Sequence, residues 1–111
     1  MAEELTNITN AFDAFALSIR EERYYDAHED LERIWYPRRF EEGDEVRLWK
    51  GFINAAVSFE LLKRGRSKPS EVAWATYLKY CPLLETVVTP RKELYVKIAQ
   101  AIDLKKKEFH V

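Results

Sequence analysis

The most regular hydrophobic pattern lies at the start of the chain, where large apolar residues recur at alternating spacings of three and four. These residues are Leu5, Ile8, Phe12, Phe15 and Ile19. Spacings of three and four bring side chains onto one face of an α-helix. The pattern therefore predicts a helix from near the start of the chain to about Arg20.

A second amphipathic segment runs from Tyr24 to Tyr36. Its apolar side is formed by Tyr24, Ala27, His28, Leu31, Ile34 and Trp35, and its polar side by Glu29, Asp30 and Arg33. We expect a helix that ends at Pro37, because the residue before a proline is pushed out of helical geometry. The polar stretch from Arg38 to Gly43 is then a loop.

The third predicted helix is apolar on almost every side. It begins near Asp44, a candidate cap, with Glu45 in its first turn, and runs to about Arg64 before Gly65. A helix that is apolar on most faces is usually surrounded by other helices. We therefore expect this helix to be the central one.

Prolines mark the starts of two further helices, about Pro69 to Tyr80 and about Pro90 to Lys107. Pro82 ends the first of them, and Leu83 to Val88 forms another turn. The apolar stripe of the last helix consists of Leu94, Ile98, Ala101 and Ile102. Together these patterns predict an all-α fold, a compact single domain over residues 1–111 with about five helices and the third at its centre.

Charge and cysteine content limit the partners and the cellular location expected for this domain. The formal net charge is -1, from 18 basic and 19 acidic residues, so no overall field attracts nucleic acid or an anionic membrane. The single Cys81 excludes a disulfide within the chain and favours a reducing, cytoplasmic location. Residues Met1 to Leu5 do not resemble a signal peptide, and we expect no membrane-spanning segment.

The segment from Tyr24 to Trp35 also carries a recognisable motif. An aromatic pair is followed by Ala-His-Glu, a glutamate at Glu32 and a tryptophan three residues later. This motif resembles the signature of a small helical family, the domain of unknown function family three-hundred-and-nine. Lys50 to Ala56, a glycine among apolar and small residues, looks like the family's second block. The resemblance covers about residues 12–84 and implies a compact all-helical fold, with no established activity.

The chain departs from the family pattern at two places. Glu22 and Arg23 stand where the family tends to have a glycine before the aromatic pair. Asn54 and Glu60 stand near positions where the family tends to have a glutamine and a histidine on the long helix. The resemblance implies that any site completed by those family residues is altered in this chain.

His28 and Glu32 are the main candidates for chemistry, because a spacing of four makes them neighbours on one helix face. A half-buried imidazole beside a carboxylate can act as a general base. The interpretation we favour is structural: Glu32 holds a core histidine that packs on Trp35 and fixes how the second helix docks on the third. Further candidate binding residues are Glu29, Trp35, Asn54 and Glu60.

The sequence gives little support for a metal site or for a cysteine nucleophile. The zincin motif needs a second histidine where this chain has Glu32, and the only other histidine is His110 near the C-terminus. We therefore predict no metal site and no cofactor. Cys81 fits a small core residue better than a nucleophile.

Two surface features leave alternatives open. The basic runs Arg38–Arg39 and Lys63 to Lys68 fit solvated turns better than an RNA-binding surface. A second set of residues fits either core packing or a self-association surface. That set is Trp49, Trp74, Tyr77 and Tyr80.

Three functions follow from these features. The favoured one is a non-catalytic interaction or scaffold module that forms a homo-oligomer. The first alternative is a small-molecule binder or enzyme that uses His28 and Glu32, with Glu60 from the central helix. The second is a weak nucleic-acid accessory protein, which requires that four arginines converge on one face. Those arginines are Arg38, Arg39, Arg64 and Arg66.

Overall fold

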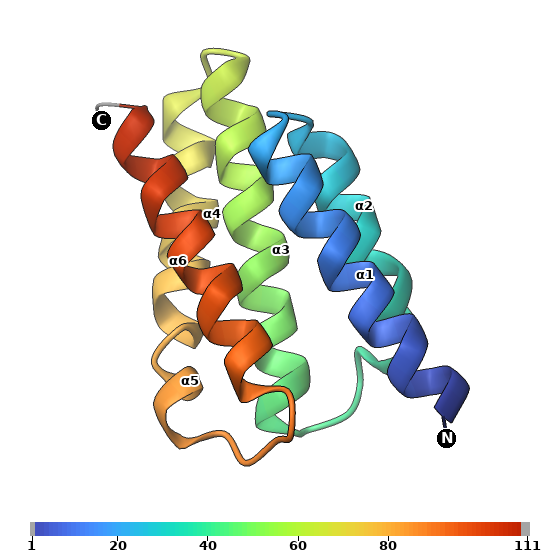
Figure 1. Ribbon diagram of the computed structural model, residues 1–111. Helices are drawn as coiled ribbons and strands as arrows, with labels where there is room; N and C mark the ends of the chain where they lie inside the picture. Colours follow the sequence, from blue (N-terminus) through green and yellow to red (C-terminus); the bar gives the residue numbers. More distant parts are fainter. Residues whose placement is uncertain (1, 110–111) are drawn as a thin grey trace.

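Five long helices dominate the computed structural model, which describes the backbone of residues 2–109 and the side chains of residues 6–109 (Figure 1). The long helices are α1 (Ala2–Arg20), α2 (Tyr24–Trp35), α3 (Asp44–Lys63), α4 (Ser67–Tyr80) and α6 (Lys92–Glu108). A short 3-10 turn, η1 (Tyr36–Arg38), follows α2, and one turn of helix, α5 (Leu83–Thr86), precedes α6. No strand occurs among the described residues. The all-α prediction is confirmed.

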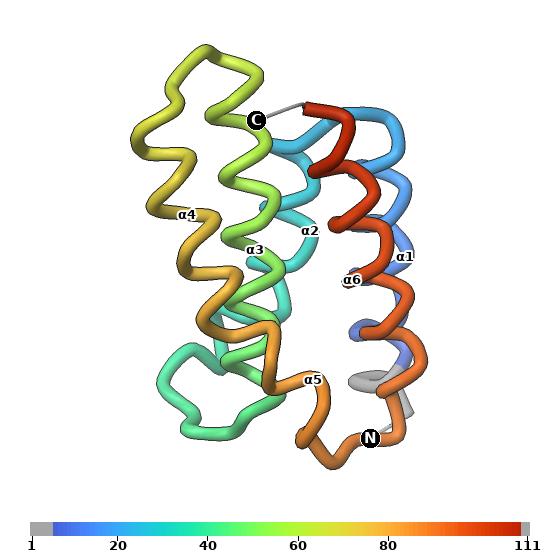
Figure 2. Tube along the Cα trace, turned by 90° about the vertical axis from the view of Figure 1, so that its left-hand side faces the viewer, coloured from blue at the N-terminus to red at the C-terminus, as the bar shows by residue number. Residues whose placement is uncertain are grey.

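Helix α3 lies at the centre, as its apolar pattern predicted. It packs against α2 and α4 along its length and also contacts α5 and α6. Figures 1 and 2 show α1 and α2 as one antiparallel pair and α3 and α4 as another, with α6 lying over both pairs. Trp49, Phe52 and Phe59 of α3 are fully buried, because neighbours surround the helix on several sides.

Aromatic rings fill the core between α1, α3 and α6. Phe12 of α1 is fully buried, and its ring centroid lies 6.3 Å from that of Trp49, 6.0 Å from Phe52 and 5.1 Å from Tyr95. Phe15 and Ile19 are buried as predicted, whereas the side chain of Leu5 lies outside those described. On α6, Tyr95 is a fully buried residue that the predicted stripe omitted.

Several helix boundaries differ from the predictions: α4 begins at Ser67, two residues before Pro69, and α6 begins at Lys92, two residues after Pro90. Tyr36 keeps helical backbone angles (φ -57°, ψ -45°) although it precedes Pro37. The chain tightens into the 3-10 turn η1, where the ring of Pro37 needs no amide hydrogen, so the loop begins after Arg38. At the start of α3, Gly43 is the capping residue and Asp44 is the first helical residue, with no side-chain capping bond.

Helices α1 and α3 end in the same backbone motif. After α3, Gly65 has a positive φ of 75°, and its amide donates to the Leu62 carbonyl (3.0 Å). After α1, Glu22 has a positive φ of 62°, and its amide donates to the Ile19 carbonyl (3.1 Å). In this motif glycine is the usual residue, because a side chain is strained in left-handed geometry. Glu22 is therefore a glutamate at a position that favours glycine.

Replacing Glu22 by glycine is expected to stabilise the fold. Relief of left-handed strain outweighs the added chain entropy, for a net gain of about 0.5–1 kcal/mol in the free energy of unfolding. Urea denaturation measures this change. The matched control is Gly65→Ala, which places a side chain in the same geometry and should cost about 1 kcal/mol. A Glu22→Gly variant that is no more stable than the wild-type protein would contradict the strain at this turn.

Candidate functional site

The imidazole of His28 is held from both sides by its own helix. Nδ1 donates to the carbonyl of Tyr25 (3.0 Å), and Nε2 lies 3.1 Å from a carboxylate oxygen of Glu32. The ring of Tyr25 meets the imidazole edge-on, and the His28 side chain is 21% exposed. Both ring nitrogens therefore have a partner within α2.

Two other candidates, Trp35 and Asn54, lie apart from this imidazole. Trp35 follows His28 by seven residues, about two turns or roughly 10 Å along the helix, and packs against the edge of the core. The Asn54 side chain donates to the carbonyl of Lys50, one turn earlier in α3 (2.9 Å). Trp35 is thus engaged in core packing, and Asn54 in a bond within its own helix.

A pocket of about 230 Å³ lies between α2 and α3 next to His28. Its lining residues are Tyr24, Tyr25, His28, Val57, Glu60, Leu61 and Arg64. The pocket brings His28 of α2 together with Glu60 of α3, two candidates that are distant in the sequence. Glu60 accepts a hydrogen bond from Nε of Arg64 (2.8 Å). The pocket therefore combines apolar walls with one ion pair.

Glu29 and Glu32 belong to a different surface. Both line a shallow hollow on the outer side of α2, together with Arg33 and Tyr36. Of these two glutamates, Glu32 pairs with His28. The candidate residues are thus divided between two surfaces of α2.

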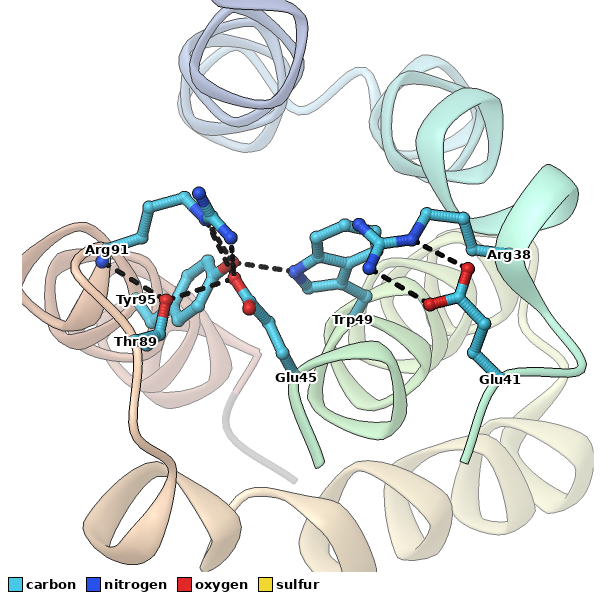
Figure 3. A network of polar contacts seen from close by, with 7 residues as sticks. All are labelled: Arg38, Glu41, Glu45, Trp49, Thr89, Arg91 and Tyr95. Atoms are coloured by element: carbon cyan, nitrogen blue, oxygen red, sulfur yellow. Dashed lines mark hydrogen bonds and ion pairs between the residues drawn. The ribbon is translucent and has the colours of Figure 1, made fainter. Parts of the chain in front are cut away.

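A polar network at the start of α3 went unrecognised in the sequence (Figure 3). One oxygen of Glu45 accepts bonds from Nε of Arg91 (2.7 Å), the hydroxyl of Thr89 (3.2 Å) and the hydroxyl of Tyr95. The indole of Trp49 donates to the Tyr95 oxygen (2.8 Å). Burial, reinforced by Glu45, raises the pKa of Tyr95, so its hydroxyl stays protonated and can donate. The network ties α6 to α3.

Hydroxyl groups elsewhere also join helices. Ser58 of α3 and Ser70 of α4 are buried with their oxygens 2.8 Å apart, and the Ser70 hydroxyl also bonds the Ser58 carbonyl (2.9 Å). Ser18 of α1 donates to Asp30 of α2 (2.9 Å). Asp30, which the sequence assigned to the polar side of α2, is only 13% exposed. It lies where α2 meets α1, because a buried hydroxyl there needs an acceptor.

The aromatic set is mostly core. Trp49 and Tyr77 are buried, so a self-association surface at these two residues is contradicted. Trp74 is partly buried and carries the ammonium of Lys106 over its ring (4.9 Å). Burial raises the pKa of the Cys81 thiol, which disfavours the nucleophilic thiolate.

The four arginines proposed for nucleic acid do not share a face. Arg38 and Arg39 precede α3, whereas Arg64 and Arg66 follow it, at opposite ends of a 20-residue helix about 30 Å long (Figure 1). Arg38 pairs with Glu41 (3.0 Å). The convergence that the nucleic-acid hypothesis needed is contradicted.

Among the described residues, no group of three or more His, Cys, Asp or Glu side chains is arranged to hold a metal ion. His110 lies outside the described residues. No described helix is long and apolar enough to cross a membrane.

The segment from the middle of α1 to the first turns of α4 contains the pocket and the strained turn at Glu22. No curated protein and no solved structure shows a significant match to the chain. A family model does match: residues 12–72, more than half of the chain, fit the family described as Domain of unknown function (DUF309). This match confirms the family predicted from the Tyr24 to Trp35 motif. The chain belongs to the DUF309 family.

Proposed function

We propose that this protein is a non-catalytic interaction module that forms a homodimer through a surface of the α2–α3 connection made of two exposed aromatic residues and one partly buried arginine. Tyr36, Arg39 and Phe40 form this surface, which we call the aromatic platform. Both ring nitrogens of His28 already have partners within α2, and this supports a structural role for the imidazole.

The arrangement of Arg39 between two rings is the observation that carries the proposal. Its guanidinium lies 3.6 Å from the ring centre of Tyr36 and 4.5 Å from that of Phe40, and it donates to the Tyr36 carbonyl (2.6 Å). Phe40 is nevertheless 84% exposed and Tyr36 is 54% exposed. Side chains already held in place lose little entropy on binding. The platform therefore has the composition and rigidity of an interface anchor.

A second copy of the chain is the partner that fits this surface. The net charge of -1 means that two copies hardly repel each other. A two-fold contact is self-complementary, so Arg39 of each copy can face the ring of Phe40 of the other. Each platform then supplies both the cation and the ring.

Sedimentation equilibrium tests this proposal with one variant and one control. Phe40→Ser should weaken the dimer at least about tenfold, the loss typical of an interface anchor. Val72→Ser is the matched control, because Val72 is an equally apolar, exposed residue on α4. Its dimer constant should stay within about twofold. A wild-type protein that remains monomeric at millimolar concentration, or equal effects of both substitutions, would overturn the proposal.

A further inference from the structure

We propose that the pocket between α2 and α3 binds a small zwitterion with an apolar body, namely a free α-amino acid with an apolar or aromatic side chain. This site is separate from the aromatic platform. The inference depends on three features: the size of the pocket, its apolar walls, and the ion pair at its edge.

The size of the pocket limits the ligand. Its volume of about 230 Å³ equals the space of roughly eight water molecules and is smaller than most pockets for drug-sized compounds. Val57 and Leu61 of α3 and the ring of Tyr24 give it apolar walls. A single leucine or phenylalanine has a suitable size and gains free energy when its side chain leaves water.

The ion pair selects the charge of the ligand. Nε of Arg64 bonds one oxygen of Glu60 (2.8 Å), which leaves the other oxygen and the two terminal nitrogens of Arg64 for a ligand. A ligand ammonium fits Glu60, and a ligand carboxylate fits the Arg64 fork. A ligand with only one charge would upset the neutral pair and leave one charge uncompensated. A zwitterion satisfies both.

His28 contributes a fixed wall. Its two bonds to Tyr25 and Glu32 hold the ring in one orientation beside the pocket. A wall that is already ordered costs little to organise when the ligand enters. Because the ring nitrogens are engaged, the geometry favours holding the ligand over transforming it.

An NMR titration of the full chain with L-phenylalanine tests the inference. Amide signals of Val57, Leu61 and Arg64 should shift with a dissociation constant on the order of 1 mM, about what a ligand of this size achieves. The probes 2-phenylethylamine and 3-phenylpropionate each lack one charge of the zwitterion. Both should bind at least about tenfold more weakly, because each probe offers an oppositely charged group to only one member of the Glu60–Arg64 pair.

Two variants complete the experiment. Glu60→Gln keeps the shape of the side chain and should weaken L-phenylalanine binding about tenfold, while the dispersed spectrum shows that the fold is intact. Glu29→Gln removes a carboxylate from the outer side of α2 and should change nothing. Absent shifts, equal binding of all three probes, or equal effects of the two variants would each overturn the inference.

Discussion

Replacing Glu45 by alanine should lower the free energy of unfolding by about 3 kcal/mol. The side chains of Glu45 and Arg91 are only 20% and 17% exposed, so their ion pair is mostly shielded from water. Its loss leaves Arg91 and the Tyr95 hydroxyl without their shared acceptor. Removing one partner from a buried pair is costly because the other partner stays desolvated. Urea denaturation followed by circular dichroism measures the loss.

The control for this variant is Glu41→Ala. Glu41 also pairs with an arginine, Arg38, but the glutamate is half-exposed. An exposed pair contributes about 1 kcal/mol or less, so this substitution should have a small effect. If the two alanine variants lose equal stability, the network around Glu45 does not fasten α6 to α3 as described.

Replacing Gly51 by leucine should cost about 2–3 kcal/mol. Helices α3 and α4 approach so closely here that a Cβ on residue 51 would lie 3.0 Å from Cβ of Tyr80 and 3.8 Å from the Tyr77 carbonyl. A leucine side chain forces the helices apart, and overpacking of this kind typically costs 1–3 kcal/mol. Thermal and urea denaturation give the change in stability.

A second substitution at the same position separates packing from helix propensity. Gly51→Ala adds a single carbon and gains about 1 kcal/mol of helix propensity, so its loss should be much smaller than that of leucine. Asn54→Leu, on the same helix, adds an apolar side chain at a partly buried position and should be nearly neutral. A leucine at residue 51 that is tolerated as well as one at residue 54 would show that the close approach is not required.

The features that could be predicted from the sequence are those that depend on neighbours along the chain. The spacing of Phe12, Phe15 and Ile19 predicted a helix face because a helix brings residues three and four apart together. The apolar residues on almost every side of α3 predicted in the same way that this helix lies at the centre. The contact between His28 and Glu32 also follows from a spacing of four.

The features that escaped prediction depend on contacts between distant residues. Glu45 bonds residues 44 to 50 positions later, and no local pattern indicates that Thr89 or Tyr95 will meet it. The pattern assigned Asp30 to the polar side of α2, but it gave no sign that Ser18 of α1 would donate to its carboxylate. His28 and Glu60 line the same pocket only because α2 packs against α3, and no local pattern in the sequence indicates that contact.

The strained turn at Glu22 falls between these two cases. The resemblance pointed to a missing glycine near this position, but only the backbone shows why one is favoured there. A positive φ is a property of the turn between α1 and α2, and a glutamate gives no local sign of it.

The His28 imidazole is a fixed part of α2, held through both of its ring nitrogens. Two-dimensional NMR of the ¹⁵N-labelled imidazole tests it directly, because it reports which ring nitrogen carries a proton. We expect a proton on Nδ1, bonded to the Tyr25 carbonyl and slow to exchange with water, and an Nε2 signal that moves in Glu32→Gln. A ring with an unprotonated Nδ1 and an Nε2 signal indifferent to Glu32 would contradict it.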